Sequence, residues 1–462
     1  MSRVRAIPGQ RGMALMLMLM LVIVGVAALG LFVNSLSLSA LKIENERKTA
    51  EALAQAKAAL IGYAAGVAMA GGGERPGDLP CPDNHPAGDP LEGTPSAPCS
   101  GNTLGRLPWK KLGLPDLRDG SGERLWYAVS VNFKNSPRTG ALNSDTFGTL
   151  TVRDPSGAIV SDGSGAGGAI AVVVAPGGAL VRRDNVQQER SAGNYNNPAH
   201  YLDCAGDAPA CGIEDNRDFA NGGTNGFIQG EIRDAGGNPV VNDRLIAIAY
   251  GDLMPLLEKR VAREALLCLA DYAAQGQNKG RFPWAAKLDG GAAPNYDDDS
   301  GARFGRLPDT FARTVADSGG AMKNGWTTAC NLNLGSWWNN WKQMTFFALA
   351  DAFKPASPLT TPACGVTGTC LTVTPLAGGA NKQAVVLVAG RRLAGVAGGQ
   401  PRASNANKGD PANYLEDDNN PNAPPPAAAD VYARQPAAAS FNDSAAYCYT
   451  DGMSGLTKCW PE

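Results

Sequence analysis

The chain contains few side chains that could perform acid–base or nucleophilic chemistry. Its 462 residues include only two histidines, His85 and His200. His200 lies in the sequence NPAHYLD, and a second copy of this sequence, DPANYLE, carries Asn413 in its place. This difference favours a structural role for His200. A serine nucleophile elbow, an HExxH motif, a P-loop and a dinucleotide fingerprint are all missing from the sequence. We therefore predict that the protein is not an enzyme.

Ten cysteines are the next candidates for chemistry. Cys81 and His85 could begin a zinc site, but no second Cys/His pair follows at a matching spacing. An even number of cysteines in an exported chain is typical of disulfides. Nearest-neighbour pairing predicts five bonds, of which the three with short spacing are the better supported (204–211, 364–370 and 448–459). The full predicted set is Cys81–Cys99, Cys204–Cys211, Cys268–Cys330, Cys364–Cys370 and Cys448–Cys459.

Two acidic segments offer oxygen ligands for a hard cation. Residues 297–299 are Asp-Asp-Asp, and residues 416–420 read EDDNN. Calcium takes six to eight oxygens, which carboxylates and amides of one loop could supply. Neither segment has EF-hand spacing, so a solvated acidic turn is the alternative for both.

Tryptophans are concentrated in one short stretch. Trp326, Trp337, Trp338 and Trp341 lie among several asparagines and account for four of the eight tryptophans. Exposed indoles beside amides would suit a surface or glycan ligand. Packing in a hydrophobic core is the alternative.

The element that would position the whole chain is an apolar segment near the N-terminus. From Met13 to Val33 there are 21 residues without a charge, and about 20 apolar residues form a helix that spans a bilayer. Arg3, Arg5 and Arg11 precede the segment. The positive-inside rule then predicts a single-pass bacterial inner-membrane protein, with its N-terminus in the cytoplasm and its bulk in the periplasm.

The N-terminal segment resembles that of the type IV pilin and type II secretion pseudopilin family. A secretory signal is cleaved after its apolar run, whereas here the small residue Gly12 stands before the run and directly after a basic leader. The resemblance implies that a prepilin peptidase cuts after Gly12, that the new N-terminal Met13 is methylated, and that the apolar helix remains as anchor and filament core. Most family members have Glu at the fifth mature position. Leu17 stands there in this chain, as an apolar residue does in tip-type pseudopilins.

The resemblance also bears on ligands and partners. Some pseudopilins hold calcium in a late loop, which favours Glu416, Asp417, Asp418 and Asn420 as the calcium ligands; no other cofactor is expected. The implied partners are other pilin or pseudopilin subunits, the prepilin peptidase and the inner membrane, and the protein would be extracellular once assembled into a pilus. The net charge of −2 gives no indication of a nucleic-acid partner.

The sequence beyond the apolar segment is duplicated. GRLP of 105–108 recurs at 305–308, LTV of 150–152 recurs at 371–373, and AVVVAPGGAL of 171–180 recurs as AVVLVAGRRL at 384–393. The distance from Ala171 to Asn197 equals that from Ala384 to Asp410, at 26 residues. Apolar spacing predicts helices over about 34–69 and from Asp252 to near Gly276, each followed by a loop and an antiparallel sheet.

The predicted fold class is α+β: a long N-terminal membrane-spanning helix followed by two tandem pilin-like modules, each a helix packed on an antiparallel sheet. The predicted divisions are a leader (1–12), a transmembrane helix (13–33), module 1 (34–250) and module 2 (251–462). We expect a non-enzymatic minor subunit of a type IV pilus or type II secretion-like filament, placed at the tip because of Leu17 and the doubled globular part. The alternative is a tip adhesin that binds a surface or glycan ligand through Trp337, Trp338 and Trp341.

Overall fold

The computed structural model describes most of the chain after residue 39. The described ranges are 40–66, 75–100, 103–206, 211–219, 221–288, 296–333, 337–365, 370–376, 378–393, 399–421, 430–450 and 457–460. The predicted leader, the predicted transmembrane segment 13–33 and the processing residues Gly12, Met13 and Leu17 lie outside these ranges.

The described helices correct the predicted fold class and localisation. In the ranges given above, no helix is both long enough and apolar enough to cross a membrane. The first described helix, residues 40–66, is amphipathic: it buries Leu53 and Leu60 and carries exposed ion pairs such as Arg47–Glu51. Its charges belong in water. The long membrane-spanning helix of the predicted fold class and the single-pass inner-membrane localisation are therefore not supported. The described fold is mixed α+β, with many short strands and few helices.

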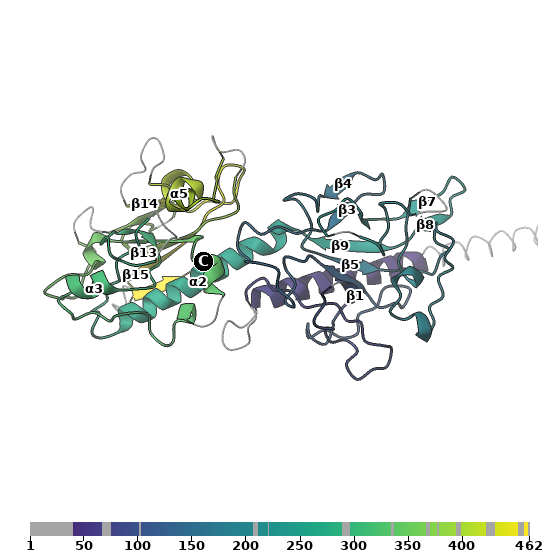
Figure 1. The fold of residues 1–462 in the computed structure, drawn as a ribbon, viewed down its shortest axis with the longest axis horizontal. Coiled ribbons are helices and arrows are strands. Elements are labelled where there is room, and N and C mark those ends of the chain that lie inside the picture. The colour runs from purple at the N-terminus through teal and green to yellow at the C-terminus, as the bar shows by residue number, and fades with distance from the viewer. Residues whose placement is uncertain are drawn as a thin grey trace, which may run out of the picture.

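The first sheet has four antiparallel strands in the order β1-β2-β5-β9 (Figure 1). One face packs on helix 40–66, where Leu60 meets Tyr127, Val173 and Ile248 in a common core. The opposite face is covered by a small sheet of order β4-β3-β6, in which β3 and β6 are parallel. The strands are β1 (Leu104–Arg106), β2 (Trp126–Val129), β3 (Thr151–Arg153), β4 (Ile159–Ser161), β5 (Ala171–Ala175), β6 (Gly226–Ile228) and β9 (Arg244–Ile248).

The second sheet has five antiparallel strands in the order β10-β11-β13-β15-β16. It packs on helix α2 (Tyr250–Ala274), and a parallel pair, β12 and β14, accompanies it. The strands are β10 (Phe304–Arg306), β11 (Thr345–Leu349), β12 (Thr372–Thr374), β13 (Lys382–Val388), β14 (Val431–Ala433), β15 (Ser444–Thr450) and β16 (Thr457–Trp460).

The two sheets share their strand register as well as their order. Arg106 pairs with Trp126 in the first sheet, and Arg306 pairs with Phe346 in the second. Ala171 lies opposite Ile248, as Ala384 lies opposite Cys448. The sequence repeat therefore corresponds to a repeat of the same sheet. We call helix 40–66 with the first sheet and its cover the first module, and α2 with the second sheet and its cover the second module.

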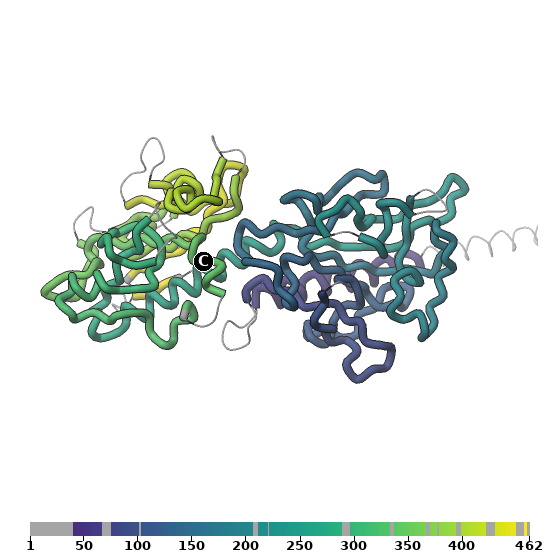
Figure 2. Tube along the Cα trace, in the orientation of Figure 1, coloured from purple at the N-terminus to yellow at the C-terminus, as the bar shows by residue number. Residues whose placement is uncertain are grey.

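Helix α2 joins the modules. Near its start, Lys57 Nζ lies 2.8 Å from Asp252 Oδ2, and further along, Arg260 Nη1 donates to the carbonyl of Ala65 at 3.0 Å. The helix then continues onto the second sheet, so the molecule consists of two bodies with α2 running from one to the other (Figure 2). The second module consequently lies beyond the C-terminal end of helix 40–66.

The remaining elements are short. They are β7 (Ile232–Arg233), β8 (Pro239–Val241), α3 (Ala312–Asp317), α4 (Trp338–Trp341), α5 (Asn405–Gly409), η1 (Ala192–Asn194), η2 (Pro198–His200), η3 (Asn331–Asn333), η4 (Asp351–Phe353), η5 (Pro411–Asn413) and η6 (Asp417–Asn419).

The five predicted disulfides are confirmed. The bonds are Cys81–Cys99, Cys204–Cys211, Cys268–Cys330, Cys364–Cys370 and Cys448–Cys459. Cys268–Cys330 ties α2 to the loop before α4, and Cys448–Cys459 joins β15 to β16.

Candidate functional site

A buried arginine occupies the centre of the first module. Arg106 ends β1 and is 2% exposed. Its guanidinium lies 4.2 Å from the ring centroid of Trp126, 4.7 Å from that of Tyr195 and 4.0 Å from that of Tyr201. It donates to the carbonyls of Arg124 and Tyr195 at 3.1 and 2.9 Å. Burial lowers the pKa of Arg106, and the aromatic faces and carbonyls supply the negative potential that offsets this.

Arg306 occupies the equivalent place in the second module. Its guanidinium lies 4.4 Å from the ring centroid of Phe346 and 4.6 Å from that of Tyr414. Nη2 donates to the carbonyl of Lys408 at 2.8 Å, and burial lowers the pKa of Arg306. Among the described residues, neither Arg306 nor Arg106 has a carboxylate within ion-pair distance. The contacts of both arginines hold loops against the sheet and do not form a binding site for an anionic ligand.

The glycine before each arginine is required by close backbone packing. A Cβ on Gly105 would lie 2.8 Å from the carbonyl O of Asp83, and one on Gly305 would overlap the carbonyl O of Ala286. The loop strand at 83 bridges β1 at Arg106, and that at 286 bridges β10 at Arg306. The repeated GRLP motif is thus explained by packing.

A pair of buried carboxyl groups lies at the edge of the first sheet. We call Asp203 and Asp243, both 0% exposed, the first carboxyl pair. Asp243 Oδ2 accepts from Asp203 N at 2.7 Å and from Asn216 Nδ2 at 2.8 Å. Asp203 Oδ1 accepts from Gln188 Nε2 at 2.9 Å, and Oδ2 accepts from Asn242 N at 2.8 Å. The pair therefore joins three loop segments to the start of β9.

The second carboxyl pair, Glu416 and Asp443, repeats this arrangement in the second module. Asp443 Oδ2 accepts from Glu416 N at 3.0 Å and from Asn419 Nδ2 at 3.2 Å. Glu416 Oε1 accepts from Gln400 Nε2 at 2.6 Å, and Oε2 accepts from Asn442 N at 3.1 Å. Each donor has the same chemical identity as its counterpart in the first pair.

The asparagine of each pair links it to the small covering sheet. Asn216 Oδ1 accepts from Ile228 N of β6 at 2.7 Å, and Asn419 Oδ1 accepts from Ala433 N of β14 at 2.8 Å. Each pair therefore connects the main sheet, the loops and the small covering sheet.

Burial raises the pKa values of the carboxyl groups in both pairs. It raises the pKa of Asp203 to about 6. Burial, and then repulsion from Asp203, raises the pKa of Asp243 well above its usual value. The same two causes act on Asp443 beside Glu416, and burial raises the pKa of Glu416 as well. Oδ1 of Asp243 and Oδ1 of Asp443 are buried without a hydrogen-bond partner in the described part of the chain.

Paired carboxyl groups perform general acid–base catalysis only where substrate reaches them. Asp203 and Asp243 are closed off from solvent, and backbone and amide donors occupy three of their four oxygens. This geometry makes the pairs structural clamps.

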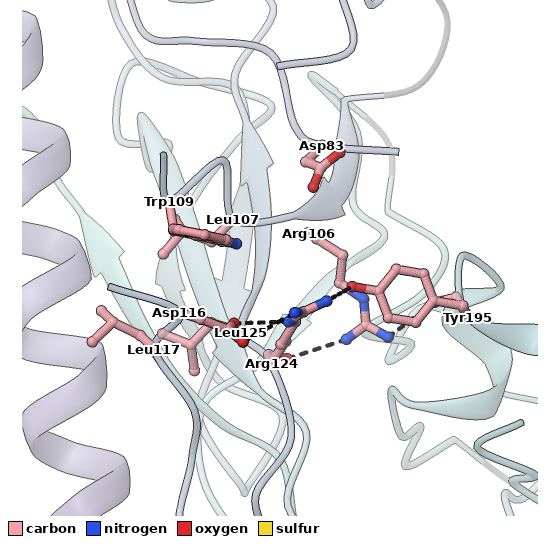
Figure 3. A pocket seen from close by; sticks show the side chains of 9 residues that line it. All are labelled: Asp83, Arg106, Leu107, Trp109, Asp116, Leu117, Arg124, Leu125 and Tyr195. Atoms are coloured by element: carbon pink, nitrogen blue, oxygen red, sulfur yellow. Dashed lines mark hydrogen bonds and ion pairs between the residues drawn. The ribbon is translucent and has the colours of Figure 1, made fainter. Parts of the chain in front are cut away.

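A small pocket lies in the first module (Figure 3), where the space between the lining side chains is about 230 Å³ with open solvent included. Its lining residues are Asp83, Arg106, Leu107, Trp109, Asp116, Leu117, Arg124, Leu125 and Tyr195.

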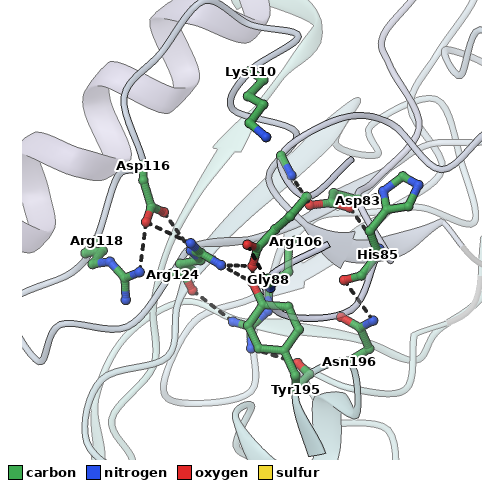
Figure 4. A network of polar contacts seen from close by, with 12 residues as sticks. Asp83, His85, Gly88, Arg106, Lys110, Asp116, Arg118, Arg124, Tyr195 and Asn196 are labelled. Atoms are coloured by element: carbon green, nitrogen blue, oxygen red, sulfur yellow. Dashed lines mark hydrogen bonds and ion pairs between the residues drawn. The ribbon is translucent and has the colours of Figure 1, made fainter. Parts of the chain in front are cut away.

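Most charges of this pocket are engaged with one another, and Arg106 is the exception (Figure 4). Arg124 Nε and Nη2 lie 2.7 and 3.0 Å from the two oxygens of Asp116. Arg124 Nη1 also donates to Glu92 and to Tyr195 Oη, and Tyr195 Oη donates to Glu92 at 2.6 Å. This network joins loops around β1 and β2.

Both histidines have structural contacts. His85 Nδ1 lies 2.7 Å from Asp83 Oδ1, while Asp83 Oδ2 accepts from Gly93 N at 2.6 Å. His200 Nδ1 accepts from Glu189 N at 3.0 Å. His85 Nδ1 also lies 3.3 Å from Ser96 Oγ. The same ring nitrogen contacts Asp83, so the three groups do not form a relay through both ring nitrogens.

The residues predicted to bind calcium are divided between different roles. Glu416 is 5% exposed, and its oxygens are occupied within the second carboxyl pair. Asp417 is exposed and Asp418 half-buried on η6, and Asn420 is buried. The structure brings Glu416 together with Asp443 rather than with its neighbours in sequence. Calcium binding by Asp417, Asp418 and Asn420 stays a prediction.

Other clusters of cation ligands are also engaged. Asp298, the middle residue of the acidic segment 297–299, accepts from the N–H groups of Arg313 and Thr314 at the start of α3, at 2.9 and 2.7 Å. Asp184, Cys204 and Cys211 come within 4.8 Å of one another, but the two cysteines form a disulfide and have no thiolate to offer.

The tryptophans proposed as ligand-binding residues lie in the core. Trp337, Trp338 and Trp341 are 2%, 5% and 1% exposed. Trp337 Nε1 donates to the carbonyl of Asn331 at 3.1 Å. This burial favours the core-packing alternative, so the adhesin alternative has lost the exposed indoles on which it depended.

The carboxyl pairs were not predicted from the sequence, although the sequence holds part of their signal. Asn242-Asp243 recurs as Asn442-Asp443, but the repeat alone assigns no role to the aspartates. Gln188 and Gln400, which complete the pairs, lie outside the matched stretches. The sequence signal for the carboxyl pairs is a polar residue that occurs in both copies of the repeat, next to a buried strand.

Comparisons with protein-family models, with curated proteins and with solved structures found no match for the chain.

Proposed function

We propose that the protein is a non-enzymatic minor subunit of a type IV pilus or type II secretion-like filament, located at its tip. The observation that carries the proposal is helix 40–66 lying across a four-stranded antiparallel sheet. This is the layout that the N-terminal resemblance to pilins implies. The five disulfides suit a protein that works in an oxidising, exported environment.

The state of the polar groups supports a structural role. The buried arginines stack on aromatic rings, and both carboxyl pairs are bonded to backbone and amide donors. Groups that already form hydrogen bonds within the protein are poor candidates for catalysis. Catalysis needs a free acid or base within reach of the reacting atom.

The position of the second module supports the tip. It lies beyond the C-terminal end of helix 40–66, because α2 leaves that end at the Arg260–Ala65 contact and carries the second sheet away from it (Figure 2). In a filament of stacked subunits, this space would belong to the next subunit along the axis. A subunit that fills it is compatible with the end of a filament and poorly compatible with its shaft. Leu17 in place of the family's Glu agrees with this position.

Immunogold labelling of sheared filaments from the native host tests the proposal. We expect gold at one end of each filament, at about one label per filament. Label spaced along the shaft would contradict the tip position, and label absent from filaments would contradict the proposed function altogether. A strain that lacks the gene provides the control for antibody specificity.

A further inference from the structure

The two sheets differ at one edge. In the second sheet β16 pairs antiparallel with β15, with Tyr447 opposite Trp460 and Cys448 opposite Cys459. The counterpart of β15 in the first sheet is β9, because Ile248 holds the register position of Cys448. In the described ranges, β9 is the last strand of its sheet and nothing pairs with its outer side (Figure 1). The duplication therefore shows what kind of element covers this edge in the sister module: one short antiparallel strand.

The outward groups of β9 can be identified from its hydrogen bonds. The carbonyl of Ile248 accepts from Ile170 N at 2.7 Å, on the side of β5. Backbone groups alternate in direction along a strand, so those of Leu245 and Ala247 face the outer edge. Tyr447, the register counterpart of Ala247, likewise faces β16. The outer edge of β9 thus presents the same bonding pattern that β15 uses to bind β16.

Lys57 lies at the outer edge of β9, where the second module has β16. Lys57 Nζ donates to the outward carbonyl of Ala247 at 3.0 Å and also pairs with Asp252 at 2.8 Å. Tyr63 and Tyr272 are each followed by two alanines, and aligning the two helices on these tyrosines places Lys57 at the position of Leu266 in α2. Leu266 is fully buried. Lysine on an open edge discourages indiscriminate strand pairing. A strand that replaces the bond to Ala247 would leave the Lys57–Asp252 ion pair intact.

We infer that the outer edge of β9 binds an extended segment of a neighbouring subunit of the same filament, which adds as a fifth antiparallel strand where β16 lies in the second module. This inference rests on the proposed function. Main-chain bonds to Leu245 and Ala247 supply the affinity, and the four-residue length of β16 sets the length expected of the donor. The donor is a different subunit, because a subunit confined to the tip has no second copy beside it.

Hydrogen exchange measured residue by residue tests the inference on the full chain. The amides of Leu245 and Ala247 should exchange at least tenfold more slowly in filaments than in the isolated protein, because the added strand would accept hydrogen bonds from them. The amides of Ile246 and Ile248, which face β5, should be protected in both states. Equal exchange of Leu245 and Ala247 in the two states would overturn the inference.

A proline substitution gives a second, independent readout. Ala247→Pro removes an outward N–H without breaking a bond to β5, so we expect a folded protein whose incorporation into filaments falls at least tenfold. Val160→Pro is the matched control, because Val160 lies on the exposed edge strand β4 and is 58% exposed; it should incorporate normally. Normal incorporation of Ala247→Pro would overturn the inference. If Ala247→Pro does not fold, the exchange measurement decides alone.

These outcomes separate the inference from the proposed function. If the unmodified protein is found in filaments and Ala247→Pro incorporates equally well, the inference fails and the proposed function stands. If the unmodified protein is absent from filaments, the proposed function fails and the inference fails with it.

Discussion

At the scale of residues, the two modules use the same polar chemistry in their interiors. Arg106 and Arg306 are buried on aromatic faces, and their positive charge is met by ring faces and carbonyl oxygens. The carboxyl pairs present the opposite problem, since two acidic groups are buried together. An uncompensated buried charge is costly, which is why burial raises the pKa values of these groups.

The carboxyl pairs lead to a prediction about stability. Asp243→Ala removes the acceptor of Asp203 N and of Asn216 Nδ2. Each buried donor left unsatisfied costs about 1–3 kcal/mol, so we expect a loss of roughly 2–5 kcal/mol in the free energy of unfolding, measured with urea at pH 7. Asp243→Asn keeps an acceptor oxygen for both donors and carries no charge, so it should lose much less. Equal losses in the two variants would contradict the clamp role.

Glu258 of α2 leads to a prediction about pH. It lies 4% exposed between the modules, near Ser144, Tyr250 and Ser444, and burial raises its pKa to about 8. Between its unfolded pKa and pH 8, the folded state holds a proton that the unfolded state has released. The stability contributed by neutral Glu258 is therefore lost as pH rises, by about 1.4 kcal/mol per pH unit.

The matching measurement is the free energy of unfolding at several pH values between 5 and 8. The slope for Glu258→Gln should be less negative than that of the unmodified protein, since the amide does not titrate. The carboxyl pairs have raised pKa values too and give both proteins a falling slope, so the difference between the slopes isolates Glu258. Identical slopes would show that Glu258 does not carry the proton.

At the scale of elements, close backbone contacts and a shared helix determine how each module is built. Helix 40–66 serves the first sheet, whereas α2 contacts helix 40–66 through Arg260 and then covers the second sheet. The loops that precede β1 and β10 run so close to these strands that only glycine fits beside the arginine.

Glycine substitutions test this element-scale packing. Gly305→Ala would place its Cβ on the carbonyl O of Ala286, and we expect a loss of about 2 kcal/mol or more in stability because the loop must move off β10. Gly251→Ala is the control, since a Cβ there meets nothing within 4 Å and lies in α2. It should be neutral or stabilising by up to about 1 kcal/mol. Thermal unfolding of both variants measures the difference.

At the scale of the whole molecule, the sequence repeat was the most informative feature. The predicted helices over 34–69 and from Asp252 to near Gly276 overlap helix 40–66 and α2, and each is followed by the predicted antiparallel sheet. Apolar periodicity and repeated motifs are local signals, so a single sequence carries them. Nearest-neighbour pairing of cysteines succeeded because four of the five bonds join residues 18 or fewer positions apart, so that most partners are local in the sequence.

Features that depend on distant partners were not predictable in the same way. Asp203 contacts Asp243, which lies 40 residues further along the chain. The neighbouring sequence does not distinguish an aspartate that becomes buried from one in an exposed turn. The acidic segment 416–420 was interpreted as a cation site, although Glu416 points inward to Asp443. The adhesin alternative treats Trp337, Trp338 and Trp341 as a binding surface. Their burial depends on how the second module packs around them, which the local sequence does not show.

The mature N-terminus, measured by mass spectrometry on protein purified from the native host, shows most directly whether the protein is a pilin-like filament subunit. For such a subunit we expect a chain that begins at Met13 with a methylated amine, and a variant substituted at Gly12 that keeps residues 1–12. An intact leader in the unmodified protein, or cleavage C-terminal to the apolar segment 13–33, would contradict this expectation.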